Sequence, residues 1–160
     1  VPLLKELDAL PVNPSGRPDV VPVSFVVESI IRLLERPNLK YDCYHLSAGL
    51  EGSATYSVLS DVVDRYYERE TPLTLLRPSE WTREMHRRVI RTPYQRKIFS
   101  SLRNYLPFLN MNVLYDHGRL REELGDQFPV LSPLQTYLAD MLSVLSTDPV
   151  ADRLLSAVRA

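Results

Sequence analysis

The first half of the chain alternates short apolar runs with segments of helical periodicity. Residues 19–23, 40–46 and 73–76 are apolar runs of strand length. Apolar positions at helical spacing lie between them, after residue 24 and over residues 56–70. The order strand, helix, strand, helix, strand is typical of α/β units with a largely parallel sheet.

The residues at the ends of these segments agree with that interpretation. Ser24 is suited to cap the first helix, which is expected to end near Pro37, and Thr55 is suited to cap the second helix. We expect Pro22 at the end of its strand, because proline cannot donate to a central ladder. The apolar face of the first helix is predicted to consist of Phe25, Ile30, Ile31 and Leu34.

From Pro78 onward the pattern is helical. Five segments carry helical periodicity and are separated by proline or glycine. They are residues 81–91, 94–106, 118–124, 133–145 and 149–158. The predicted fold class is therefore α/β and helix-rich, with an α/β segment over residues 1–77, a helical subdomain over residues 78–160, and both in one compact unit.

Composition narrows the classes of partner. The 160 residues are 44% hydrophobic, enough for the core of one domain, and the net charge of −1 gives no field that would attract nucleic acid. No apolar run approaches the roughly 18 residues needed to cross a bilayer, and the N-terminus lacks the layout of a signal peptide. We expect a cytoplasmic protein without a membrane span. Because Val1 is not an initiator methionine, we also expect a fragment.

The sequence contains few of the residues that a self-sufficient enzyme would need. Cys43 is the single cysteine, and the three histidines lack any paired spacing, so we assign no metal ligand. The Gly-Leu-Glu-Gly of residues 49–52 does not make a dinucleotide-binding turn. None of the tyrosines is followed by lysine four positions later, so we assign no catalytic residue either.

Two motifs carry a resemblance to a known family. Residues 17–30 read Arg-Pro-Asp-Val-Val-Pro-Val-Ser-Phe-Val-Val-Glu-Ser-Ile, and residues 44–49 read Tyr-His-Leu-Ser-Ala-Gly. Together they resemble the extended short-chain dehydrogenase/reductases. More narrowly they resemble the fatty acyl-CoA reductase and thioester reductase (male-sterility-like) branch. Residues 105–109, 112–116, 120–125 and 137–138 resemble the C-terminal helices of that branch, so the match spans nearly the whole chain.

The resemblance implies the C-terminal, substrate-binding portion of such an enzyme. The strands would then complete a Rossmann-type sheet, and the substrate-binding residues at the first strand-to-helix junction would be Pro22, Val23 and Ser24. Ser24 stands where the family pattern has aspartate, so only the capping role carries over. NADPH would be bound by the intact parent, whose nucleotide-binding half is missing here, and not by this chain alone.

The intact parent would reduce an acyl thioester to an aldehyde or alcohol, and this portion would hold the acyl group. An acyl chain needs a mainly apolar cleft. The candidate substrate-binding residues in the helical half are Phe99, Leu102, Tyr105, Phe108 and Tyr115, with Leu106, Leu109 and Val113 nearby in sequence. The alternative is that these side chains only pack the helices together.

The residues from 82 to 104, here called the basic segment, carry seven arginines and lysines against one acid, Glu84. Arginines bind phosphate bidentately, and a positive patch speeds encounter with an acidic partner. We therefore expect Arg87, Arg88 and Arg91 to dock acyl-CoA or an acyl-carrier protein. The alternative is a solvated face paired with acids such as Asp64.

Other functions stay open at this point. The chain is either part of an acyl thioester reductase or a non-catalytic protein-interaction module on the same scaffold. Part of a nucleotide-sugar epimerase or dehydratase is a third interpretation. A fragment would expose strand edges and an apolar face, so we expect a homo-oligomer that buries the apolar face of residues 1–34, or a fold in which residues 1–10 cover that face.

Overall fold

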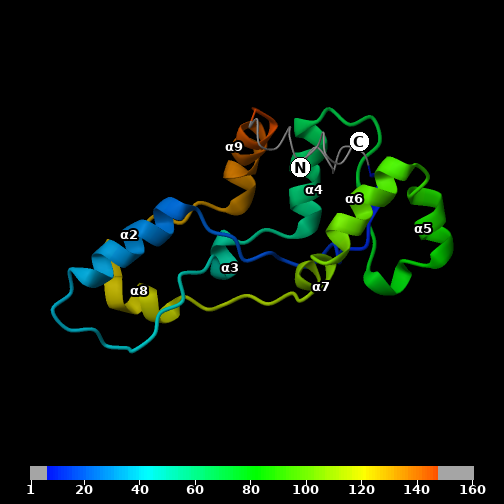
Figure 1. Ribbon diagram of the computed structural model, residues 1–160. Coiled ribbons are helices and arrows are strands. Elements are labelled where there is room, and N and C mark those ends of the chain that lie inside the picture. The colour runs from blue at the N-terminus through cyan, green and yellow to red at the C-terminus, as the bar shows by residue number, and fades with distance from the viewer. Residues whose placement is uncertain (1–6, 148–160) are drawn as a thin grey trace.

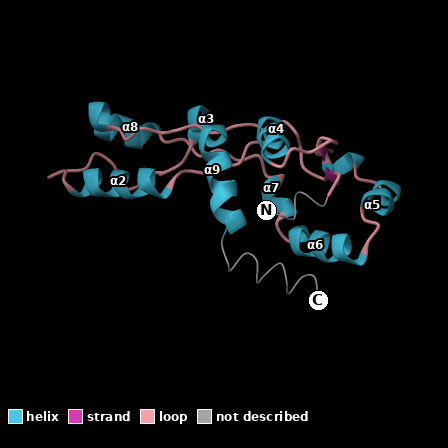
Figure 2. Ribbon diagram, turned by 90° about the horizontal axis from the view of Figure 1, so that it is seen from above, coloured by secondary structure: helices cyan, strands magenta, loops and turns pink. Residues whose placement is uncertain are grey.

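The computed structural model describes residues 7–147 and shows an elongated arrangement of short elements (Figure 1). In chain order these are β1 (Ala9–Leu10), α2 (Val23–Leu34), α3 (Gly49–Gly52), α4 (Tyr56–Tyr66), β2 (Thr74–Leu75), η1 (Pro78–Glu80), α5 (Arg83–Val89), α6 (Pro93–Arg103), α7 (Leu106–Leu109), α8 (Gly118–Leu124), η2 (Gly125–Gln127) and α9 (Leu134–Thr147). Both views place α2 and α8 at one end and α5 and α6 at the other (Figure 2). The structure is helix-rich with a small parallel sheet.

The sheet lies at the end that holds α5 and α6. Strands β1 and β2 are parallel, with Ala9 opposite Thr74 and Leu10 opposite Leu75. Around them is the largest core cluster of the described residues, in which Leu7 and Ile98 are fully buried. The predicted strand over residues 73–76 is therefore confirmed, in a shorter form.

A second cluster joins α2 to α8 at the opposite end. Phe25 packs with Leu120 and Leu124, and Phe128 meets the Phe25 ring edge-on at 5.8 Å between centroids. Between the two ends, α4 packs on α9 through a third cluster of Ala54, Leu59 and Leu134. Within residues 7–147, the hydrophobic core is thus divided into three clusters along the molecule.

Threonine side chains cap the starts of three helices, α4, α5 and α6. The Thr55 side chain accepts a hydrogen bond from the backbone N–H of Val58, which confirms the predicted cap of α4. Thr82 caps α5 in the same way, and Thr92 forms a capping box with Gln95 at the start of α6. The bounds of α8 are those predicted from the sequence.

Other helix bounds differ from the prediction. Helix α4 ends at Tyr66, four residues early, because Glu68 takes a left-handed conformation at φ 49°. The predicted helix over residues 94–106 ends at Arg103, and α7 follows as a separate turn with Pro107 inside it. The predicted helix over residues 149–158 lies outside the described residues.

The predicted strands at residues 19–23 and 40–46 are wrong, because neither segment joins a ladder in the described structure. Pro22 instead forms the N-cap of α2. In the second segment, side chains bind the backbone: Lys40 N–H donates to Glu123 Oε2 at 2.8 Å, and Tyr41 N–H donates to the Tyr44 hydroxyl at 3.0 Å. A Rossmann-type sheet is therefore not present in residues 7–147.

Two loop segments nevertheless run side by side through the middle of the molecule. Asn13 N–H donates to Asn110 Oδ1 at 3.0 Å, and Arg17 N–H donates to Asn112 Oδ1 at 3.2 Å. Asp19 then accepts the Tyr115 N–H at 3.0 Å. Because both partners advance along the chain together, residues 13–19 and 110–115 run parallel, joined by side chains in place of a strand ladder.

The predicted apolar face of α2 needs a correction. The face that packs on α8 consists of Phe25, the fully buried Ser29 and the partly buried Leu33. Ile30, Ile31 and Leu34 are exposed. Apolar residues occupy two sides of this helix, so periodicity alone could not identify the buried side. Ser24 is the second residue of the helix and makes no capping hydrogen bond.

Glu123 of α8 binds residues 40–44 through hydrogen bonds. Its ionisation also makes the stability of the folded chain depend on pH. Its carboxylate accepts hydrogen bonds from the Tyr44 hydroxyl at 2.6 Å and from Lys40 N–H at 2.8 Å. The Tyr44 hydrogen bond is the main cause that lowers the pKa of Glu123 below its ordinary value of 4.5. Because the pKa of Glu123 is lower in the folded chain, its ionised carboxylate stabilises the fold when the pH is above the ordinary pKa. That stabilisation is lost as the pH falls through the lowered pKa of the folded chain.

We therefore predict that Glu123→Gln flattens the acid side of the stability profile. The free energy of unfolding of the unmodified chain should fall between pH 6 and about pH 3, and that of Glu123→Gln should fall less steeply. Urea unfolding at stepped pH measures this. Glu70→Gln, at an exposed position, is the matched control. Equal slopes for Glu123→Gln and the unmodified chain would contradict the assignment.

Candidate functional site

Two adjoining hollows lie between α5, α6 and α7, and Phe99 and Arg103 line both of them. We call them together the Phe99 groove. The first hollow, of about 320 Å³, is lined by His86, Ile90, Arg96, Phe99, Ser100 and Arg103. The second, of about 430 Å³, is lined by Pro11, Pro78, Trp81, Phe99, Arg103, Leu106, Pro107 and Asn110.

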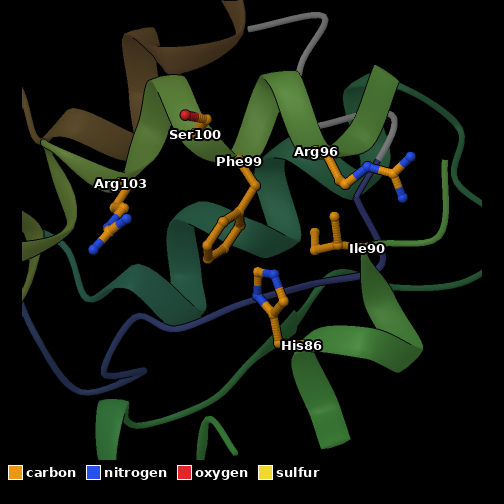
Figure 3. Close-up of a pocket in the computed structure, with 6 residues that line it drawn as sticks. All are labelled: His86, Ile90, Arg96, Phe99, Ser100 and Arg103. Carbon is orange, nitrogen blue, oxygen red and sulfur yellow. The ribbon is translucent and has the colours of Figure 1, made fainter. Parts of the chain in front are cut away.

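Aromatic rings form the wall between the two hollows. The Trp81 and Phe99 rings are stacked, with 5.6 Å between centroids and 8° between planes. His86 meets Phe99 edge-on at 4.9 Å and Trp81 at 6.1 Å. Figure 3 shows Phe99 pointing from α6 toward His86 of α5. Such edge-on and stacked pairs fix the rings in a preformed surface.

Helix periodicity places the groove residues. Arg96, Phe99, Ser100 and Arg103 are spaced three, one and three apart, so they share one face of α6. Figure 3 shows Arg96 and Arg103 on α6 on either side of Phe99. His86 and Ile90, four apart, line the facing side from α5 and its C-cap. The Thr92–Gln95 capping box and Pro93 fix where α6 begins, and therefore where this face points.

The charge of the groove is positive. Arg96 and Arg103 are exposed, and neither takes part in the ion pairs found among the described residues. The second hollow is otherwise lined by apolar side chains and the Asn110 amide. An apolar surface with guanidinium groups at its edge suits a molecule that carries both an apolar part and an anionic group.

The other arginines and the lysine of the basic segment are exposed as well. Arg87, Arg88 and Arg91 lie in and just after α5, and Arg91 Nε donates to the Arg88 carbonyl at 2.6 Å. Asp64, one proposed neutralising partner, instead pairs with Arg69 at 3.0 Å, where both side chains are nearly buried. The Asp64 carboxylate therefore pairs with Arg69 and not with the arginines of the basic segment.

Arg88 and Arg91 also line a third hollow, of about 350 Å³, beside the small sheet. Its other lining residues are Asp8, Ala9, Thr71, Thr74, Met85 and Val89. It lies against a different side of α5 from the Phe99 groove, because Met85 and Val89 line one and His86 and Ile90 line the other.

The predicted acyl-binding residues of the helical half separate into two groups. Phe99 lines the groove, and Leu102 packs against the core cluster around Ile98. Tyr105, Phe108 and Tyr115 are exposed to 64%, 70% and 52%. Tyr115 contacts His45 edge-on, at 5.4 Å between centroids.

Pro22, Val23 and Ser24 lie at the start of α2, where Val23 is 77% exposed. Helix α2 and the helices of the Phe99 groove lie at opposite ends of the molecule (Figure 1). The structure therefore does not bring the strand-to-helix junction together with the groove.

Sequence reasoning missed several residues of the groove. The predicted site residues did not include Trp81, His86, Arg96, Ser100 or Arg103. They also did not include the prolines at 11, 78 and 107. Two signals were present in the sequence. The chain has one tryptophan, and the basic segment has arginines at helical spacing around Phe99.

A scan against protein-family models and searches of curated proteins and of solved structures found no match to the chain. In residues 7–147, no group of three histidine, cysteine, aspartate or glutamate side chains could hold a metal ion. No helix of the described chain is both long and apolar enough to span a bilayer.

Two tyrosine–glutamate pairs lie outside the groove. Tyr41 donates to Glu122 at 2.5 Å, and Tyr44 donates to Glu123 at 2.6 Å. The Glu122 hydrogen bond raises the pKa of Tyr41, and burial with the Glu123 hydrogen bond raises the pKa of Tyr44. Both tyrosines therefore keep their protons at neutral pH, and both pairs join residues 40–44 to α8.

The stacked wall gives a prediction with a matched control. Phe99→Ala should lower the free energy of unfolding by about 2 to 3 kcal/mol, because it removes a partly buried ring from the Trp81 stack. Phe108→Ala, at a 70% exposed position, should change it by less than about 0.5 kcal/mol. Urea unfolding followed by Trp81 emission measures both, and equal effects of the two substitutions would contradict the arrangement.

Proposed function

We propose that this chain is the acyl-binding part of an NADPH-dependent reductase of acyl thioesters. The observation that carries the proposal is the Phe99 groove, in which an apolar wall lies beside two exposed arginines. An acyl thioester has the same two parts. Its acyl chain is apolar, and its carrier, coenzyme A or a carrier protein, bears phosphate.

The proposal assigns the two parts of the substrate to different residues. The acyl chain lies in the second hollow, against Trp81, Leu106 and Pro107. Arg103, which lines both hollows, and Arg96 bind the anionic carrier through charge-assisted hydrogen bonds. Arg87, Arg88 and Arg91 add positive charge on α5 and speed the approach of the carrier.

The proposed parent also has a nucleotide-binding half. That half supplies the phosphate-binding turn, the proton donor and NADPH.

A second function is favoured by a different observation. Helix α2 exposes a row of large apolar side chains, including Val23 and Leu34, at 77% and 79%. Exposed apolar surface of this kind marks an interface. A protein-interaction module on the same scaffold accounts for that helix, but it gives no role to the Phe99 groove.

The proposal predicts that the chain binds octanoyl-coenzyme A and that Arg103 contributes to the affinity. Because Trp81 is the single tryptophan and lines the groove, binding should change its emission. Arg103→Gln should weaken binding about tenfold, the effect of losing one charge-assisted hydrogen bond. Arg65→Gln, on the exposed side of α4, should leave the affinity unchanged.

Free coenzyme A separates the acyl group from the carrier in this titration. It should bind more weakly than octanoyl-coenzyme A, because it leaves the apolar hollow empty. Equal affinities for the two ligands, or no change in Trp81 emission up to millimolar octanoyl-coenzyme A, would contradict the proposed function.

A further inference from the structure

The third hollow, of about 350 Å³, lies beside the small sheet, and none of its residues lines the Phe99 groove. Its volume is near the lower end of the range for sites that bind small molecules. Its lining residues divide by chemistry into two groups. Ala9, Met85 and Val89 are apolar, and Asp8, Thr71, Thr74, Arg88 and Arg91 carry charges or hydroxyl groups.

Two backbone segments form walls of this hollow, and a nearly buried ion pair joins them. Arg69 Nη2 donates to the Leu7 carbonyl, and Arg69 Nε donates to the Thr71 carbonyl, both at 3.1 Å. Asp64 pairs with Arg69 and accepts the Leu73 N–H at 3.0 Å. The walls are therefore fixed before a ligand binds, which lowers the cost of binding.

The first described residues bring Asp8 to this hollow and not to α2. The apolar residues among them are buried in the cluster around Ile98, at the opposite end of the molecule from α2 (Figure 1). The expectation that residues 1–10 cover the apolar face of α2 is therefore wrong for residues 7–10. The Asp8 carbonyl accepts the Thr74 N–H at 2.9 Å, which fixes Asp8 beside the second strand.

Opposite charges line the third hollow without neutralising one another. Asp8, Arg88 and Arg91 take no part in the ion pairs found within residues 7–147. Arg91 Nε donates to the Arg88 carbonyl at 2.6 Å, which holds the Arg91 guanidinium in place and leaves its terminal nitrogens for a ligand. A complementary ligand carries an anionic group for the arginines and a cationic group for the carboxylate.

We propose that the third hollow binds a free α-amino acid with an apolar side chain. The guanidinium groups of Arg88 and Arg91 bind its carboxylate, an anion whose geometry matches the guanidinium fork. The Asp8 carboxylate binds its ammonium group, and the apolar lining residues contact its side chain. An α-amino acid carries both charges on one carbon atom, so both enter one small hollow with the apolar group beside them.

Calorimetry of the chain with L-leucine and its analogues tests each part of this complementarity. L-Leucine should bind. The analogue 4-methylpentanoate lacks the ammonium group, 3-methylbutylamine lacks the carboxylate, and glycine lacks the apolar side chain. Each should bind at least about tenfold more weakly than L-leucine, because each loses a charge-assisted hydrogen bond or the burial of an apolar group.

Substitutions locate the site. Asp8→Asn and Arg88→Gln should each weaken L-leucine binding about tenfold, the effect of losing one charge-assisted hydrogen bond. Asp61→Asn, at an exposed position on α4, should leave the affinity unchanged. Circular dichroism checks that each variant is folded, and amide shifts of the unmodified chain with L-leucine should be largest around Ala9 and Thr74.

Three results would overturn the proposal. They are no binding at millimolar L-leucine, equal affinities for L-leucine and 4-methylpentanoate, and displacement of L-leucine by free coenzyme A. The last result would assign the hollow to the carrier of the acyl group. Octanoyl-coenzyme A should bind Asp8→Asn as it binds the unmodified chain, so this site and the proposed function stand or fail separately.

Discussion

The carboxylate of Asp19 joins three segments that are far apart in the chain. Its Oδ1 accepts the Ala48 N–H at 2.6 Å, and its Oδ2 accepts the Tyr115 N–H at 3.0 Å. Ser47 adds a hydrogen bond from its hydroxyl to the Tyr115 carbonyl at 2.8 Å. Without strand ladders here, these side-chain bonds satisfy backbone groups that would otherwise lie unpaired. They connect the end that holds α2 and α8 to the remainder of the molecule.

The same junction explains why residue 49 is a glycine and why His117 is buried. His117 Nδ1 lies 3.1 Å from the Ser47 carbonyl, and its ring packs against Gly49. A Cβ at Gly49 would lie 2.6 Å from the His117 ring, and the φ of +59° also favours glycine there. The Gly49 that fails to make a dinucleotide turn therefore has a structural role beside His117.

The helices were largely predictable, and the pairing of extended segments was not. Thr55 and Pro93 mark helix starts that local chemistry decides, and the structure has helices there. Strand pairing depends on which segments lie alongside, and residues 40–46 meet the side chains of α8 instead of another strand. The length of an apolar run contains no information about that neighbour.

The candidate site was predictable only in part, for a related reason. Phe99 was identified from its apolar surroundings, but Trp81 and His86 come from neighbouring elements that reach it only in the folded chain. For α2, the sequence shows apolar residues on both sides, and only the packing of Phe25 and Ser29 on α8 shows which side is buried. Sequence periodicity identifies apolar faces, and tertiary contacts decide whether each becomes core, groove or interface.

The Phe99 groove combines an apolar wall with exposed arginines, and it lies at the opposite end of the molecule from α2 (Figure 1). The exposed apolar side chains of α2 are therefore not part of the groove.

Amide chemical-shift mapping of the ¹⁵N-labelled chain with octanoyl-coenzyme A tests the central claim most directly. The account predicts that the largest shifts occur at Trp81, His86, Phe99, Arg103 and Leu106, and that the amides of α2 keep their positions. Shifts concentrated on α2 or around Asp19, or no shifts at saturating ligand, would contradict it.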